Sequence, residues 1–297
     1  MGYQLWVSPT TGYRRKGTRF SSLKKIFVDN VTVHDVFEPL FCCQISDAPE
    51  HVKHELEVRE FDQAGVVNEH KQIIGYIETK NLNGHNIENH LQKISIDQVI
   101  SDSTPLADLL NVLKTKELAY VNHGNQVVGI VTKADINKPP VRVYIFGIIS
   151  LFEMHINFWI RKFHAHDNWT KHLNEKRLKI AKSIYEMRKG ENQDLMLLDC
   201  IQIADKRDIL SRTSLFCEQF NFSRRRFDKL LKIIEKMRNE LAHSQSSVIA
   251  NISWNDFATT LESAEGFLME SDQMIEQLAK DHAHAFEQHA VLNTIGT

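Results

Sequence analysis

The sequence predicts an α+β fold, with mixed α/β repeats in the first half and an all-helical second half. Two short apolar runs, residues 73–77 and 126–131, have the length and β-branched content of buried strands. A Pro139-Pro140 pair then interrupts the chain. Beyond this pair glycine becomes rare and long helical periodicity replaces the strand-like pattern.

Composition is that of an ordinary globular protein. The 297 residues include 42% hydrophobic and 25% charged residues, and this length suits two domains. With a formal net charge of −2, the chain as a whole has no positive potential that would attract nucleic acid, so a nucleic-acid site would have to be a local basic patch. The four cysteines form no CxxC pair, which favours reduced thiols in a cytoplasmic protein.

No segment has the pattern of a leader or a membrane span. Polar residues interrupt the N-terminal region, so we expect a cytoplasmic location. The most apolar stretch, residues 143–160, contains Glu153, His155 and Asn157. We therefore expect a buried or interface helix there and no membrane partner. The basic run at residues 12–17 suits either a phosphate contact or a solvated loop.

The expected domains are residues 1–140, with repeats near 25–85 and 95–140, and residues 141–297. In the second repeat, the segment Asp102-Ser103-Thr104-Pro105 predicts the start of a helix with proline in its first turn. The second domain is expected to be a helical bundle of ordinary domain size. Its predicted helices lie near residues 142–165, 171–188, 195–204, 206–220, 223–243 and 254–281.

An internal repeat lies in the first domain. Residues 75–81 (GYIETKN) match residues 129–135 (GIVTKAD), with the two glycines 54 positions apart. In both segments a strand is followed by glycine, two apolar residues, and polar groups three and six positions after the glycine. Such spacing indicates duplicated supersecondary units that pack against each other.

The pattern Gly–apolar–apolar–Thr–x–x–Asp resembles the nucleotide-contacting segment of CBS domains, which occur as tandem pairs and bind adenosine-type ligands between the two copies. The resemblance implies an adenine nucleotide as a regulatory ligand. Thr132 would cap a helix or bond a phosphate at its N-terminal amides, and Asp135 would accept from ribose hydroxyls. Gly129 belongs to the same segment, and Thr104 to the upstream segment that closes the pocket. Glu78 would repel a phosphate, so at most one good site is expected.

A purely structural interpretation of these residues remains open. Thr132 and Asp135 are also the residue types that cap helices, whether or not a ligand binds. In that case the repeats would be a scaffold.

The sharpest candidate for chemistry is the segment Arg238-Asn239-Glu240-Leu241-Ala242-His243. It ends a predicted helix whose apolar stripe contains Leu230, Leu231, Ile234, Met237 and Leu241. Asn239 and His243 share a different face, one turn apart. Arg238 falls inside the apolar stripe, where a guanidinium must find a partner or face a dimer cleft.

The same helix is strongly basic. Between residues 223 and 238, seven basic residues stand against two acidic ones, a local charge of +5 in a chain of −2. Three arginines at a helix start also oppose the macrodipole. Phosphate binding through Arg224, Arg225 and Lys232 would explain this cost. The alternative is a solvated charged face beside acidic neighbours.

The Arg–Asn–x–x–x–His segment resembles the motif of HEPN domains, which are helical bundles that usually dimerise. The resemblance implies a homodimer and a metal-independent endoribonuclease with RNA as substrate. His243 would move protons at the ribose 2′-OH or the leaving 5′-oxygen, because imidazole titrates near neutrality. Arg238 would stabilise the charged phosphorane and Asn239 would orient His243 or the phosphate. No cofactor is required for this chemistry.

The combined expectation is a nucleotide-regulated endoribonuclease. By analogy alone, such a layout suits a defence or stress response. The rival interpretation is a non-catalytic sensing or dimerisation scaffold with an inactive HEPN-like domain. An enzyme of another type ranks last. No metal site is expected, because the histidine pairs are spaced i to i+2 and point apart on a helix.

Overall fold

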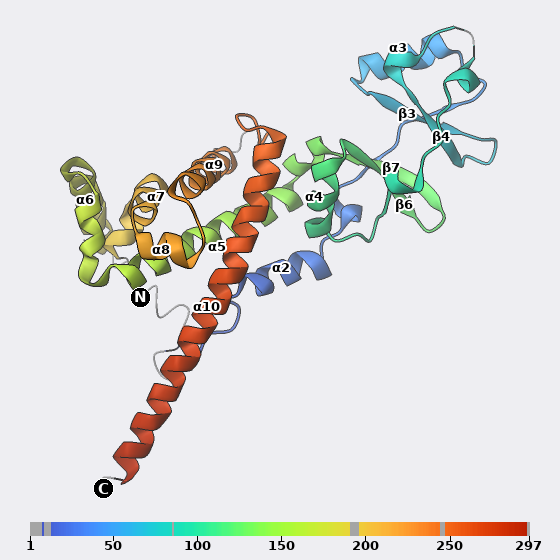
Figure 1. The fold of residues 1–297 in the computed structure, drawn as a ribbon. Helices are drawn as coiled ribbons and strands as arrows, with labels where there is room; N and C mark the ends of the chain where they lie inside the picture. Colours follow the sequence, from blue (N-terminus) through green and yellow to red (C-terminus); the bar gives the residue numbers. More distant parts are fainter. Residues whose placement is uncertain (1–7, 9–12, 85, 191–195, 244–246, 296–297) are drawn as a thin grey trace. The chain divides into compact units, whose positions relative to one another are not determined.

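A computed structural model describes residues 8, 13–84, 86–190, 196–243 and 247–295. Contacts divide the chain into two compact units (Figure 1). The repeat unit comprises residues 26–141, and the helical unit joins residues 1–25 to residues 142–297. All strands among the described residues belong to the repeat unit.

The repeat unit contains the same β-α-β-β order twice. In each copy two parallel strands flank a helix, and a third strand pairs antiparallel with the second. The first copy consists of β2 (Cys42–Gln44), α3 (Pro49–Val58), β3 (Gln63–Val67) and β4 (Ile73–Glu78). The second consists of β5 (Val99–Ser101), α4 (Leu106–Thr115), β6 (Leu118–His123) and β7 (Gln126–Thr132). The predicted duplication is confirmed by the strand pairing.

Connecting elements complete this unit. Strand β1 (Glu38–Pro39) pairs antiparallel with β7, so the sheet of the second copy has four strands and that of the first has three. Helix α2 (Phe20–Asp29) carries the chain into the unit. The short 3₁₀ helices are η1 (Val33–Asp35), η2 (Thr79–Asn81), η3 (Ile87–His90), η4 (Ile96–Gln98) and η5 (Lys133–Asn137).

The repeated glycines occupy equivalent positions in the two hairpins. Gly75 pairs with Val66 and Gly129 pairs with Val121, and the register shifts directly after each of these pairs. A Cβ atom on Gly75 would clash with the carbonyl of Gln92, and one on Gly129 would clash with the carbonyl of Glu38. Both carbonyls belong to backbone that pairs with the outer edge of the hairpin. Close backbone approach therefore explains glycine at both positions.

An apolar layer joins strands of the two copies. Leu40, Tyr76 and Tyr120 are buried in it, and the two tyrosine rings lie 5.4 Å apart between centroids. The Tyr120 hydroxyl donates to Gln63 Oε1 at 2.5 Å, which satisfies its polar end. Burial raises the pKa of Tyr120, so the phenol stays neutral.

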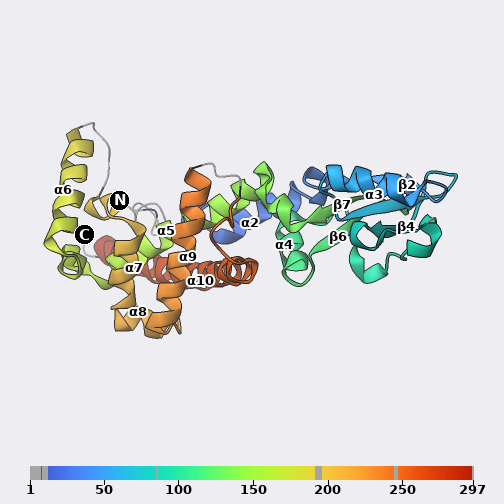
Figure 2. The same ribbon diagram turned by 90° about the horizontal axis from the view of Figure 1, so that it is seen from above.

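The helical unit is a bundle built around α5, α9 and α10. Helix α9 packs against α7 and α10 (Figure 1 and Figure 2). Its elements are α5 (Pro139–Phe163), η6 (Ala165–His172), α6 (Glu175–Gly190), η7 (Leu197–Cys200), α7 (Ile203–Ser211), α8 (Ser214–Gln219), α9 (Arg224–Ala242) and α10 (Trp254–Ile295). The helical character expected of this half is confirmed.

Aromatic side chains form much of the bundle core. The Phe220 ring lies 5.1 Å from that of Trp159 and 4.8 Å from that of Phe267. Helix α9 contributes buried Phe227, Leu230, Leu231, Ile234 and Met237. The last four of these belong to the stripe predicted from the helical wheel, and Leu241, predicted with them, is only half-buried.

The predicted helices near 195–204 and 206–220 are wrong. The structure has the short η7, then α7, and then a separate α8. Helix α7 begins after Gln202 because the Asp205 carboxylate accepts the Gln202 amide at 3.1 Å. Helix α8 ends where Asn221 adopts a positive φ of 47°.

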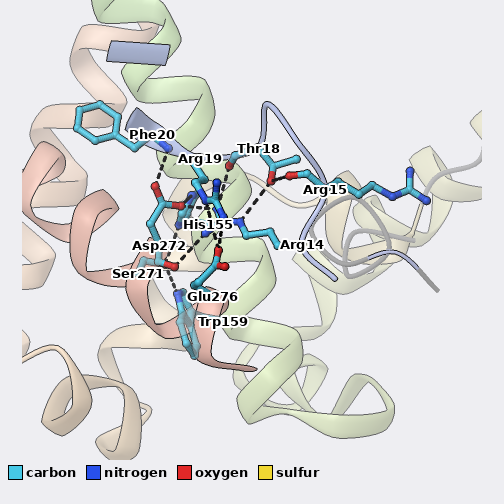
Figure 3. A network of polar contacts seen from close by, with 10 residues as sticks. All are labelled: Arg14, Arg15, Thr18, Arg19, Phe20, His155, Trp159, Ser271, Asp272 and Glu276. Carbon is cyan, nitrogen blue, oxygen red and sulfur yellow. Dashed lines mark hydrogen bonds and ion pairs between the residues drawn. The ribbon is translucent and has the colours of Figure 1, made fainter. Parts of the chain in front are cut away.

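The segment before α2 is fastened to the helical unit, which is why the contacts group it there and not with the repeats (Figure 3). The Arg14 side chain is 1% exposed and pairs with Asp272 in α10, and it also donates to the Asp272 carbonyl at 2.9 Å. The Phe20 amide donates to the same carboxylate at 2.6 Å, and Arg19 pairs with Glu276 at 2.6 Å. Arg14 is thus neither a solvated loop residue nor open to a phosphate.

Helix α5 is long and apolar enough to cross a membrane, on length and composition alone, and 56% of its most apolar window is buried within the protein. Tyr144, Ile148, Phe152, Ile156 and Trp159 line its buried face. Packing inside the bundle accounts for the apolar residues of this face, whereas Val143, Phe146 and Met154 of the same helix are exposed.

Candidate functional site

The predicted catalytic residues lie together at the C-terminal end of α9. The side chains of Arg238, Asn239 and His243 are all exposed. His243 is the C-cap residue, and its amide donates to the Asn239 carbonyl at 3.0 Å. This bond closes the last turn, so Asn239 and His243 stand one turn apart on the helix. The three side chains thus share one solvent-accessible helix end.

Arg238 has an acidic neighbour. Its Nε lies 3.7 Å from Glu153 Oε2 in α5, and 46% of the arginine side chain is exposed. Exposed ion pairs of this kind contribute roughly 0–1 kcal/mol. The closer partner of Glu153 is Lys206 in α7, whose Nζ lies 2.7 Å away and whose side chain is 3% exposed. Lys206 therefore anchors the carboxylate, and the carboxylate holds Arg238 only loosely.

The basic face of α9 is partly neutralised within the protein. Lys232 pairs with Asp228 one turn earlier, and Lys229 pairs with Asp256 in α10, both at 2.8 Å. Arg224 and Arg225, in the first turn, are exposed, and Ser223 caps the helix by accepting the Arg226 amide at 3.2 Å. Of the three predicted RNA contacts, Lys232 is therefore engaged locally. Arg224 and Arg225 remain directed to solvent at the opposite end of α9 from His243.

The repeat unit holds a pocket of about 650 Å³, a normal size for a small-molecule site. Four segments line it: residues 38–41, residues 60–63, Glu117 with Leu118, and Ile130 with residues 132–135. The first copy therefore supplies one wall through the end of α3 and the start of β3. The second copy supplies the other through the start of β6, the end of β7 and the turn that follows it.

Apolar and acidic side chains both line this pocket. The Phe41 and Phe61 rings lie 6.2 Å apart, next to Leu40, Leu118 and Ile130. The carboxylates in the lining are Glu38, Glu60, Asp62, Glu117 and Asp135, and the single lysine among the lining residues is Lys133.

Thr132 and Asp135 form a capping box at the start of η5. Asp135 Oδ2 accepts the Thr132 amide at 2.6 Å, and Thr132 Oγ1 accepts the Ala134 amide at 3.2 Å. The other Asp135 oxygen pairs with Lys138 at 2.9 Å. Burial lowers the pKa of Lys138, but its hydrogen bonds to Glu38 and Asp135 outweigh this and leave the pKa raised. Lys138 therefore stays charged, and both oxygens of Asp135 are engaged within the protein.

The other predicted ligand residues lie apart from this box. The backbone of β1 packs directly against Gly129, which is not among the residues lining the pocket. Thr104 belongs to the turn before α4, where its carbonyl accepts the Val33 amide at 2.9 Å. Of the four predicted ligand residues, the structure brings only Thr132 and Asp135 into the pocket lining.

The first repeat uses its equivalent residues differently. Asn81 Nδ2 donates to Glu78 Oε2 at 2.5 Å, and Lys80 pairs with the same carboxylate at 3.4 Å. Glu78 thus stands at the position of Thr132, but its side chain does not cap η2 and is held by Asn81 and Lys80.

Several lining residues carried no sequence signal. Phe41, Phe61, Glu60 and Asp62 lie outside any recognisable motif, and only the fold brings them to the second copy. In the turn between α3 and β3, which carries three of these residues, Glu60 has a positive φ of 57°. Among the described residues no cluster of three potential metal ligands is present.

Comparison with protein-family models and with curated proteins finds no match. Among solved structures, the chain is similar to the CBS domains of a transcriptional regulator from Streptococcus pneumoniae, with 18% identity over 36% of this chain and 98% of that one and a TM-score of 0.32. It is similar to CBSX2 in complex with AMP, with 17% identity over 38% and 97% of the two chains and a TM-score of 0.33. A CBS domain pair solved with 5′-methylthioadenosine and S-adenosyl-L-methionine gives 20% identity over 35% and 95%, with a TM-score of 0.31. The two-copy architecture itself is established by the strand pairing of this chain.

Proposed function

We propose that this chain is a ligand-regulated endoribonuclease, in which the helical unit cleaves RNA and the repeat unit binds an adenosine-type ligand. The observation that carries the nuclease assignment is the exposed end of α9, where Arg238, Asn239 and His243 lie within the last six residues, 238–243. These are the residue types that a metal-independent cleavage needs: a proton carrier, a guanidinium for phosphate charge, and a polar orienting group.

In the proposed reaction the ribose 2′-oxygen attacks the adjacent phosphorus. The bond from phosphorus to the 5′-oxygen then breaks, which leaves a 2′,3′-cyclic phosphate and a 5′-hydroxyl. In a dimer, His243 of one copy takes the 2′-OH proton, and water protonates the leaving oxygen. DNA lacks the attacking hydroxyl and would not be cut.

Arg238 is suited to a phosphate because its present partner is weak. An ion pair at 3.7 Å with a half-exposed guanidinium is readily exchanged for a phosphodiester. A guanidinium can bond two phosphate oxygens at once, which favours the anion whose charge grows in the transition state.

The decisive experiment compares wild-type protein with His243→Ala on mixed RNA in EDTA, with and without adenosine compounds. Alanine removes the proton carrier, so we expect cleavage to fall at least about a hundredfold. His54→Ala, an exposed histidine on α3 in the other unit, is the matched control and should cleave as wild type does. Equal cleavage by wild type and His243→Ala would exclude the proposed mechanism.

The pocket between the two copies supports the regulatory half of the proposal. It has the volume of a ligand site, two phenylalanine rings against which a purine could pack, and carboxylates that can accept from hydroxyl and amino groups. For the ligand to regulate cleavage, it must bind the active and inactive states with different affinities.

A non-catalytic scaffold is the second candidate. The ion pair between Arg238 and Glu153 favours it, because a structural network could use the same arginine. Under this alternative, Arg238→Ala lowers the free energy of unfolding and RNA remains intact with every variant.

A further inference from the structure

We infer that the pocket of the repeat unit takes an adenosine-type ligand without phosphate, and prefers one that carries a positive charge. The inference rests on the proposed function of this pocket and specifies the chemistry of its ligand. It follows from the charges that line the cavity and from how the nearby cations and amides are already used.

Carboxylates dominate the lining. The lining contains five carboxylates and one lysine, Lys133, and this lysine pairs with Glu117 at 2.5 Å. Lys138 is held by Glu38 at 2.5 Å and by Asp135 at 2.9 Å. Arg59, whose guanidinium lies 5.4 Å from the centroid of the lining Phe41 ring, pairs with Glu55 at 2.8 Å. A phosphate entering this space would meet Glu60 and Asp62 while both lysines are committed to other carboxylates. Like charges in a partly enclosed site repel more strongly than in bulk water.

The backbone position that would receive a phosphate is already filled. At the start of η5 the Thr132 amide donates to Asp135 Oδ2 at 2.6 Å, and the Ala134 amide donates to Thr132 Oγ1 at 3.2 Å. The Asp135 carboxylate thus occupies the place of an anion. Displacing it would cost the capping bonds and leave a 9%-exposed carboxylate beside a second negative group.

The remaining features suit a nucleoside. Phe41 and Phe61 offer ring faces and edges to a purine, and Leu40, Leu118 and Ile130 exclude water from it. Glu60 and Asp62 can accept hydrogen bonds from ribose hydroxyls or an exocyclic amine, and an ammonium would gain from their charge.

The test is calorimetric titration of the full chain with four compounds of one scaffold: 5′-amino-5′-deoxyadenosine, adenosine, AMP and ATP, at low salt and neutral pH. The amino compound carries an ammonium where AMP carries a phosphate, so the pair differs chiefly in charge. We expect the affinity to fall in the order given, with at least about a tenfold gap between the amino compound and AMP.

Two variants locate the effect. Asp62→Asn and Glu60→Gln should each raise the affinity for AMP relative to that for the amino compound, because each removes one exposed lining charge. Asp108→Asn makes the same chemical change at an exposed site in α4 outside the lining, and should leave the ratio unchanged. AMP binding as tightly as the amino compound would overturn this inference and leave the proposed pocket intact. Failure of all four compounds to bind would overturn both.

Discussion

At the scale of single residues, Asp135 is the clearest case of a side chain whose structural role can be measured. Its carboxylate caps the Thr132 amide and pairs with Lys138. We expect Asp135→Asn to lower the free energy of unfolding by about 1–2 kcal/mol, because the cap is weakened and Lys138 loses a charged partner. Urea unfolding of this variant beside Asp108→Asn would measure the difference. A drop no larger than that of the control would mean that the cap contributes nothing.

His155 predicts a pH dependence of stability. Its ring is fully buried, with Nδ1 2.6 Å from Ser271 Oγ, and it lies near Arg14 and Asp272 (Figure 3). Burial, together with the charge of Arg14, lowers the pKa of His155 from 6.5 to about 3. Below pH 6.5 the unfolded chain therefore binds a proton that the folded chain refuses, and stability falls as the pH drops.

Between pH 7.5 and pH 5 this effect amounts to about 2 kcal/mol, with a same-direction contribution from His164, whose pKa burial also lowers. Chemical denaturation across this window, before most carboxylates titrate, would measure it. His155→Gln cannot titrate, so its stability should depend less on pH even if it is lower throughout. An unchanged slope would show that His155 is not the group responsible.

Sequence reasoning reached some site residues and missed others for a physical reason. The end of α9 was predictable because Arg238, Asn239 and His243 lie within six consecutive positions at the end of one regular helix, whose geometry the spacing determines. The partner Glu153 was not, because it approaches from α5, far away in sequence. Asp135 was predicted, but the other acidic residues of the pocket lining were missed for the same reason: Asp62 joins Asp135 in this lining only through the fold.

At the scale of elements, periodicity worked where an element is long or repeated. The strands β4 and β7 and the buried stripe of α9 were predicted from their patterns. The division into α7 and α8 was not, because it falls at two single residues: Arg212 ends α7 and Thr213 precedes α8. Propensity averaged over a window does not register such single-residue terminators.

The two repeat glycines were singled out from the sequence, but the structure gives a different reason for glycine at these positions. The sequence placed Gly129 in a ligand-contacting segment, whereas the structure places it under the backbone of β1. Gly75 has the same relation to Gln92. Both repeats therefore require glycine for packing, whether or not either binds a ligand.

At the scale of the whole molecule, the division into two units does not follow the change in composition alone. The helical unit includes the segment that precedes α2, and Arg14 reaches Asp272 across 258 positions in the sequence. No local pattern reveals a contact of this separation, so residues 1–25 were expected in the first domain. The second division, between Val141 and Arg142, falls within α5 and follows the Pro139-Pro140 pair.

The proposed dimer makes the last prediction, because one copy of the chain carries one Arg238 and one His243. If two copies form each cleft, a mixed dimer of Arg238→Ala and His243→Ala still holds one arginine and one histidine. We expect each variant alone to be nearly inactive, and we expect co-refolding or co-expression of the two to restore measurable cleavage of RNA in EDTA. The matched comparison is each variant mixed with itself at the same total concentration. Were the mixture as inactive as its components while heterodimers are detected by mass, the two motifs would not share a scissile phosphate. Cleavage would then require both residues from the same chain, or would not occur at this helix end.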